Sequence, residues 1–100
     1  MNYTEILIAN PINMESIKKL FDEIESSTSK KLIINIGEHE FESLDVLKEL
    51  KKRFYQNQQA LNRFSKIAFL HSAKFENISQ DINKYNYFSD REKLLDWLNN

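Results

Sequence analysis

Short apolar runs alternate along the chain with amphipathic stretches, and this alternation restricts the fold more than any other feature of the sequence. Three runs are brief and largely apolar, which is typical of buried strands. They are Ile6–Ala9, Leu32–Ile36 and Lys66–Leu70. Between them, apolar residues recur at every third or fourth position, as on one face of a helix. The first stripe contains Met14, Ile17, Leu20, Phe21 and Ile24, and the second contains Leu44, Leu47, Leu50 and Phe54.

The last third of the chain continues the pattern. Phe75, Ile78 and Ile82 predict a short third helix capped by Ser72, and Tyr85–Phe88 predicts a fourth strand. Ser89 and Glu92 have the spacing of a capping box, so Ser89 is the expected start of a final helix. That helix would carry Leu94, Leu95, Trp97 and Leu98, and we expect it to pack on the last strand through Trp97, Tyr85, Tyr87 and Phe88. Asn13 and Ser43 are the expected caps of the first two helices.

The resulting order is βαβαβαβα over residues 1–100, which is the length of one domain. Strands joined by helices favour an α/β fold with a four-stranded, mainly parallel sheet. A mixed sheet is the remaining alternative. The pattern does not decide whether the helices cover one face of the sheet or both.

Composition excludes several functional classes. The formal net charge is −1, whereas a nucleic-acid-binding domain needs a concentrated basic surface. There is no cysteine, so disulfides, thiolate nucleophiles and cysteine-based zinc sites are absent. We find no signal peptide and no apolar run long enough to insert into a membrane, and we therefore expect a cytoplasmic protein.

Candidate binding residues follow the predicted strands, because ligands usually bind at the carboxyl ends of parallel strands. We expect the segments that begin at Gly37 and His71 to meet there. The predicted rim consists of Gly37, Glu38, His39, Glu42, Ser43, Asp45, His71 and Ser72.

No pattern among these residues predicts catalysis. The two histidines, which we expect on exposed loops, lack the spacing of a metal-binding or zinc-protease motif. The serines stand where helix caps and turns need them, and one glycine cannot form a phosphate-binding loop. We therefore predict no catalytic residue, no metal and no cofactor. A hydrolase-type enzyme that uses His39 and His71 is the least favoured hypothesis.

Two segments resemble the STAS superfamily, and its SpoIIAA-like branch in particular. One is Leu32–Ile36 with the loop and the helix from Leu44 to Leu50. The other runs from Phe64–Phe69 through Phe75 and Phe88 to Leu94–Leu98. The resemblance implies a sheet with helices largely on one face and a regulatory or protein-binding role.

In anti-anti-sigma members of that superfamily, the corresponding helix begins with Asp-Ser-Ser-Gly and is phosphorylated on a serine. Here Ser43 stands at the aspartate, Leu44 and Asp45 at the serines, and Val46 at the glycine. The phosphorylation motif is therefore absent. The chain also has fewer residues before its first helix than many members, so the edge of its sheet could be open to a second copy.

The favoured function is a non-enzymatic regulatory or protein-interaction module whose partner is another protein. The alternative is a domain that binds a small molecule, either an apolar or anionic metabolite or a lipid. The small size and the open edge would also allow a homodimer.

Overall fold

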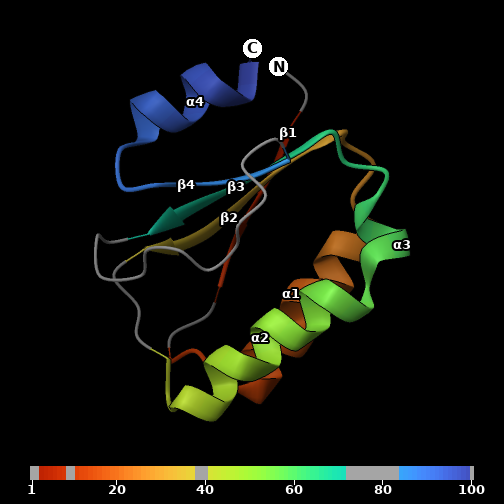
Figure 1. The fold of residues 1–100 in the computed structure, drawn as a ribbon, viewed down its shortest axis with the longest axis vertical. Coiled ribbons are helices and arrows are strands. Elements are labelled where there is room, and N and C mark those ends of the chain that lie inside the picture. Colours follow the sequence, from red (N-terminus) through yellow and green to blue (C-terminus); the bar gives the residue numbers. More distant parts are fainter. Residues whose placement is uncertain (1–2, 9–10, 38–40, 72–83, 100) are drawn as a thin grey trace.

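The computed structural model describes residues 3–8, 11–37, 41–71 and 84–99, which contain a four-stranded sheet in the order β1-β2-β3-β4 (Figure 1). The strands are β1 (Tyr3–Leu7), β2 (Lys31–Gly37), β3 (Lys66–His71) and β4 (Tyr85–Phe88). Every neighbouring pair is parallel. The α/β class and the mainly parallel sheet are therefore confirmed, and the described strands form no mixed sheet.

Helices cover both faces of this sheet. The helices α1 (Met14–Ser26), α2 (Leu44–Gln56) and α3 (Gln58–Leu61) lie on one face, and α4 (Arg91–Asn99) lies on the other (Figure 1). Because α1 joins β1 to β2 and α2 with α3 joins β2 to β3, both crossovers pass over the same face, as crossovers of one handedness do. The predicted helix through Phe75, Ile78 and Ile82 lies outside the described residues.

The ends of three helices test the predicted caps. The Asn13 side chain accepts a hydrogen bond from the Ser16 amide at 2.9 Å, and Ser43 accepts one from the Val46 amide, so both of these caps are confirmed. The prediction for Ser89 is wrong by one residue. The Asp90 carboxylate accepts the hydrogen bond from the Glu92 amide at 2.9 Å, because α4 begins at Arg91 and its unpaired amides lie next to residue 90.

The first strand begins earlier than its apolar run predicted. It spans Tyr3–Leu7 instead of Ile6–Ala9 and pairs with β2 from Tyr3 beside Lys31 to Leu7 beside Asn35. The strand lies at the edge of the sheet. Only some of its side chains are buried there, so its first residues need not be apolar. An apolar run is therefore a poor guide to its start.

β2 is buried on both faces, as its nearly continuous apolar run predicted. Leu32, Ile34 and Ile36 belong to the core formed with α1 and α2, whereas Ile33 belongs to the core formed with α4. All four are fully buried. Burying such a side chain stabilises the fold by about 1.5–3 kcal/mol, so β2 anchors both helical layers.

The aromatic residues of β4 divide between the two faces, which corrects our prediction that α4 packs on all of them. Phe88 lies 5.7 Å from Trp97 of α4, measured between ring centroids. Tyr85 and Tyr87 face the opposite side, where Tyr87 stacks on Phe69 at 4.8 Å and Tyr85 meets Phe54 at 6.3 Å. Alternate side chains of a strand point to opposite faces, so residues 85 and 87 cannot share a side with residue 88.

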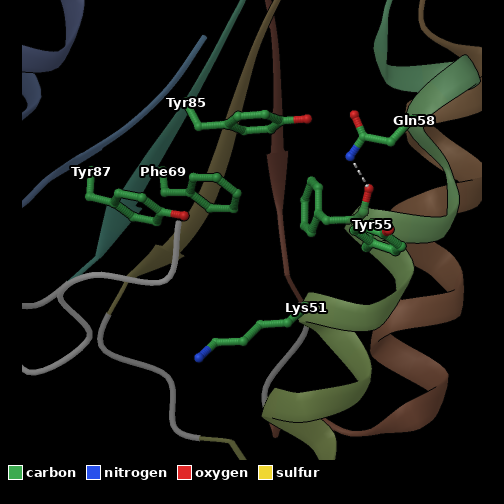
Figure 2. A pocket seen from close by; sticks show the side chains of 7 residues that line it. Lys51, Tyr55, Gln58, Phe69, Tyr85 and Tyr87 are labelled. Carbon is green, nitrogen blue, oxygen red and sulfur yellow. Dashed lines mark hydrogen bonds between the residues drawn. The ribbon is translucent and has the colours of Figure 1, made fainter. Parts of the chain in front are cut away.

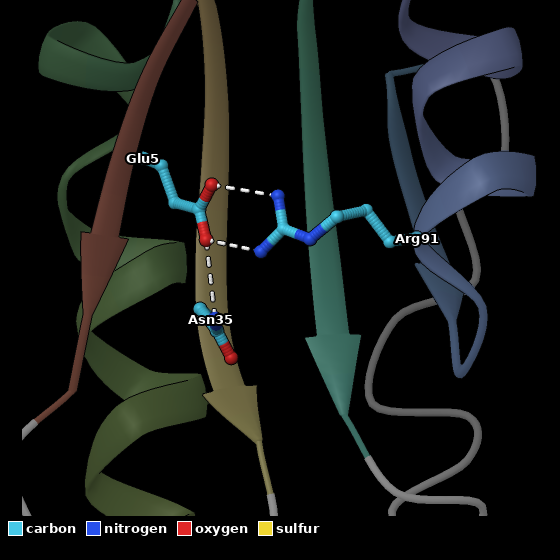
Figure 3. A network of polar contacts seen from close by, with 3 residues as sticks. All are labelled: Glu5, Asn35 and Arg91. Carbon is cyan, nitrogen blue, oxygen red and sulfur yellow. Dashed lines mark hydrogen bonds and ion pairs between the residues drawn. The ribbon is translucent and has the colours of Figure 1, made fainter.

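Polar contacts attach α4 to the sheet at both of its ends. The Lys66 ammonium donates to the Trp97 carbonyl at 2.6 Å. At the start of α4, the Arg91 guanidinium reaches across the sheet to Glu5 of β1 with hydrogen bonds of 2.9 and 2.6 Å, and the Asn35 amide donates to the same carboxylate at 3.1 Å (Figure 3). This network joins the first strand to the last helix.

The hydrogen bonds from Arg91 are the main reason why the pKa of Glu5 lies below its ordinary value. Partial burial acts in the opposite direction, and the Asn35 amide adds to the lowering. A carboxyl whose pKa is lower in the folded state stabilises the fold at pH values above its ordinary pKa. The stabilisation is lost as the pH falls from 4.5 through the lower folded value.

We predict that Arg91→Gln lowers the free energy of unfolding by about 1 kcal/mol at neutral pH, the upper end for an exposed pair, because this pair is bidentate and networked. The difference from the wild type should shrink to zero in acid, where Glu5 is protonated in both proteins. Urea unfolding over a pH series measures it, with Glu25→Gln on the exposed side of α1 as the control. A difference that persists in acid would contradict the ionic origin.

Candidate functional site at the carboxyl edge of the sheet

The carboxyl ends of β2 and β3 lie side by side. Gly37 pairs with His71, and the register shifts between Asn35 and Gly37. The two residues at which the predicted segments begin are therefore adjacent, as expected, whereas residues 38–40 and 72–83 lie outside the described residues. Among the predicted rim residues, Glu38, His39 and Ser72 lie outside the described residues.

Gly37 turns the chain out of the sheet with a backbone φ of +60°. Most residues with a side chain avoid this left-handed region, at a cost of about 1–2 kcal/mol. The sequence predicted that Gly37 ends the strand, and the angle supplies the reason.

A second contact joins the loops that leave β1 and β2. Ile12 forms an isolated parallel bridge with Phe41, and the Glu42 amide donates to the Ile12 carbonyl at 2.8 Å. Met14 and Leu44, the first residues of α1 and α2, follow this bridge by a few positions. The two helices therefore begin next to each other and run side by side (Figure 1).

Both helices begin with an exposed apolar residue. Met14 is 48% exposed and Leu44 is 65% exposed, although the spacing of the helical stripes predicted that both belong to the core. That prediction is wrong because the first turn of each helix extends past the end of the sheet, where the described strands no longer cover it.

Acidic residues flank these two apolar residues in the sequence. Glu15, Glu42 and Asp45 are exposed at the same helix starts. Carboxylates in a first turn are favoured by the helix dipole, and Ser43 is engaged as the α2 cap. We call the set Met14, Glu15, Glu42, Leu44 and Asp45 the acidic rim.

His71 has a different environment from the one predicted. We expected an exposed loop histidine, but His71 is the last residue of β3 and only 5% of it is exposed. Its ring lies 5.8 Å from the ring of Tyr87. β3 continues one residue beyond its apolar run, so His71 belongs to the strand. Its imidazole is therefore buried, on the face of the sheet that α1 and α2 cover.

A cavity that the sequence analysis missed lies between α2 and strands β3 and β4. It has a volume of about 180 Å³ and is partly open to solvent, and Figure 2 shows the side chains around it. Its lining consists of Lys51, Phe54, Tyr55, Gln58, Phe69, Tyr85 and Tyr87. The sequence contained a clue to this cavity. Tyr85 and Tyr87 are two positions apart in a strand, so both rings point to the side of the sheet where Phe54 lies.

One charged side chain, Lys51, lies among aromatic ones in this lining. The Gln58 amide nitrogen is occupied, because it donates to the Phe54 carbonyl at 2.8 Å (Figure 2). Lys51 is three residues from Lys48 and adjacent to Lys52, all exposed on α2. The described lining therefore combines aromatic walls with a positive charge at the helix side.

Metal sites and membrane spans were sought within the same described parts of the chain. No group of three or more histidine, cysteine, aspartate or glutamate side chains there is arranged to hold a metal ion. No helix there has the length and apolar character needed to cross a membrane. Comparisons with family models, with curated proteins and with solved structures found no match.

We predict that Gly37→Ala lowers the free energy of unfolding by about 1–2 kcal/mol, because alanine is strained at positive φ. Gly37→Asn should cost less, since asparagine tolerates this region better. The nearest atom to an added Cβ would be Asn35 Oδ1 at 3.4 Å, so a steric clash does not account for the loss. Thermal and urea melts of both variants measure it, and equal losses would argue against a backbone origin.

Proposed function

We propose that this chain is a non-enzymatic interaction module of the STAS and SpoIIAA-like kind, and that it binds another protein through the acidic rim. The observation that carries the proposal is the exposure of Leu44 and Met14 at adjacent helix starts. Apolar side chains surrounded by polar ones are typical of the centre of a protein interface.

Charge indicates the chemistry of the partner. Glu15, Glu42 and Asp45 are exposed and lie within two residues of Met14 or Leu44 in the sequence, so a complementary surface combines apolar and basic side chains. The resemblance to the STAS superfamily independently points to the start of α2, because Leu44 and Asp45 stand where related chains carry their regulatory serines. In this proposal, the chain acts as a regulator because it binds its partner protein.

Native lysate passed over the immobilised chain tests the acidic rim. We predict that Leu44→Ser combined with Glu42→Lys depletes at least one captured protein by tenfold or more, which corresponds to about 1.4 kcal/mol. Both positions are exposed, so folding should change by no more than about 0.5 kcal/mol. Glu25→Lys, on the exposed side of α1, is the matched control. The same captured proteins in the same amounts on all three chains would reject the acidic rim.

The cavity beside α2 favours a second candidate function, the binding of a small molecule. An apolar cavity of about 150 Å³ holds benzene, so the roughly 180 Å³ here suits a single aromatic ring. Lys51 would attract an anionic substituent on that ring. The class of ligand is therefore a small aromatic acid, within the wider group of apolar or anionic metabolites.

For this function we predict that benzoate binds with a dissociation constant on the order of 1 mM, or about 4 kcal/mol. Lys51→Gln should weaken benzoate several-fold and leave benzyl alcohol unchanged, because only the anion uses the ammonium group. Lys52→Gln, which changes a neighbouring exposed lysine outside the lining, is the control. NMR titration of the aromatic resonances measures binding, and no shifts with either probe would reject the cavity as a ligand site.

A further inference from the structure

The outer side of β1 offers backbone groups to a further strand. The Ile8 amide donates to the Asn35 carbonyl at 3.1 Å, and the residues of a strand alternate in the direction of their amide and carbonyl groups. The even-numbered residues of β1 therefore bond towards β2. The odd-numbered ones present their backbone groups on the opposite side, and they are Tyr3, Glu5 and Leu7. No other described strand pairs with that side.

These backbone groups determine the conformation of a chain that pairs with them. A chain can bond to successive outward groups of a strand only if it is itself extended, as when a peptide adds a strand to the edge of a sheet. Antiparallel pairing is slightly more stable per residue than parallel pairing, so it is the favoured orientation. In that orientation, the residues of the added segment that lie directly opposite Tyr3, Glu5 and Leu7 bond to β1.

The α4 side of the sheet determines every second side chain of such a segment. Tyr3 packs against the core on the α4 side, and Glu5 meets Arg91 of α4 there (Figure 3). Because side chains alternate along a strand, Leu7 belongs to the same face, and 62% of it is exposed. Residues directly opposite each other in paired strands share a face and contact each other. The segment therefore needs apolar residues on this face.

A groove of about 310 Å³ between β1 and α1 determines the intervening side chains, which point to the α1 face. The charged residues in its lining are Lys19, Asp22 and Glu23, and all three are exposed. Two carboxylates outnumber one ammonium group, so the groove favours a cation. A lysine or arginine side chain can lay its methylene groups along the groove and donate to a carboxylate at its end.

We propose that the open edge of β1 binds an extended, antiparallel segment of another protein in which apolar and basic residues alternate. The apolar side chains cover Leu7 on the α4 side, and the basic ones enter the groove beside Asp22 and Glu23. A second copy of β1 fits this edge poorly. Antiparallel pairing over Tyr3–Leu7 would set Glu5 against the partner's Glu5, and like charges directly opposite each other are destabilising. The surface shares no residue with the acidic rim and is independent of it.

Amide hydrogen exchange measured by NMR tests the pairing, with the acetylated and amidated peptide Lys-Val-Lys-Val-Lys-Val-Lys as the probe. About 10 mM peptide fills a site whose dissociation constant is about 1 mM. We expect it to slow exchange of the Glu5 and Leu7 amides by about fivefold or more, and to leave the Ile6 amide, which already bonds to β2, unchanged. Unchanged exchange at Glu5 and Leu7 would overturn the proposal. Protection of both in the chain alone, rising with its concentration, would assign the edge to a second copy and overturn it too.

N-methylated peptides separate backbone pairing from simple attraction between charges. In the proposed arrangement the valine amides face β1, whereas the lysine amides face solvent. Methylation of the valine amides should therefore weaken binding by about tenfold or more, and methylation of the lysine amides should leave it nearly unchanged. The two peptides carry the same charge. Equal binding by both would refute the edge pairing, and loss with the methylated lysine amides alone would refute the antiparallel orientation.

Substitutions in the chain locate the side-chain contacts. Leu7→Lys should weaken the peptide several-fold, and so should Asp22→Asn combined with Glu23→Gln. Glu25→Gln, which lies on α1 outside the groove lining, is the matched control and should have no effect. Equal weakening by Glu25→Gln would contradict a role for the groove, because the peptide would then respond to the total charge of the chain.

The acidic rim needs its own control, since it could also attract a basic peptide. Leu44→Ser combined with Glu42→Lys changes the acidic rim at positions outside the groove lining, and we expect the peptide to protect the Glu5 and Leu7 amides as before. Loss of that protection would reject the β1 edge as the site. The proposed function does not use β1, so failure of the peptide at this edge would leave the acidic rim standing.

Discussion

The parallel pairing of β2 with β3 is the constraint on which the rest of the structure depends. Parallel neighbours cannot be joined by a tight turn, so the chain must return over a face of the sheet between them. Each return brings a helix back to the amino end, and each helix therefore starts at the carboxyl end. The meeting of Gly37 and His71 and the adjacent starts of α1 and α2 follow from this single geometric requirement.

Burial of β2 on both faces makes that pairing stable. Ile33 contacts the α4 side while Ile34 contacts the α1 and α2 side, so neither helical layer can be removed without exposing part of the strand. The two layers are unequal, however. The α1 and α2 side has the larger core with its aromatic cluster, whereas α4 covers its own face mainly over β3 and β4. The reach of Arg91 to Glu5 (Figure 3) ties β1 to this smaller layer.

Much of the fold could be predicted because the local signals agreed with one another. The period of the apolar residues identified α1, α2 and α4, and short apolar runs identified β1, β2 and β3. Asn13 and Ser43 marked two helix starts, and Gly37 marked a strand end. Residues 84–88 illustrate the limit. The fourth strand was found from its composition, yet its aromatics were assigned to one helix because the alternation of faces was not applied to Tyr85 and Tyr87.

The candidate sites could be predicted less well, for physical reasons. Periodicity reports which face of an element is apolar but not how far the neighbouring element extends. Met14 and Leu44 continue the stripes of their helices and are nevertheless exposed, because the sheet ends before the helices do. His71 shows the opposite error, since a polar residue at the end of an apolar run was taken for a loop although the strand includes it.

The exposure of Met14 and Leu44 bears on function, because apolar residues in the stripe of an amphipathic helix are usually buried. A stripe residue left in water gains nothing from the hydrophobic effect in the single chain. Leu7, Met14 and Leu44 all lie towards the carboxyl end of the sheet, at the edge of β1 and at the starts of α1 and α2. Tyr55 near the end of α2 is also exposed, at 80%, whereas the other described apolar residues of β1, α1 and α2 are buried or half-buried. The exposed apolar side chains at this end of the sheet are the observation on which the proposed contact with another molecule rests.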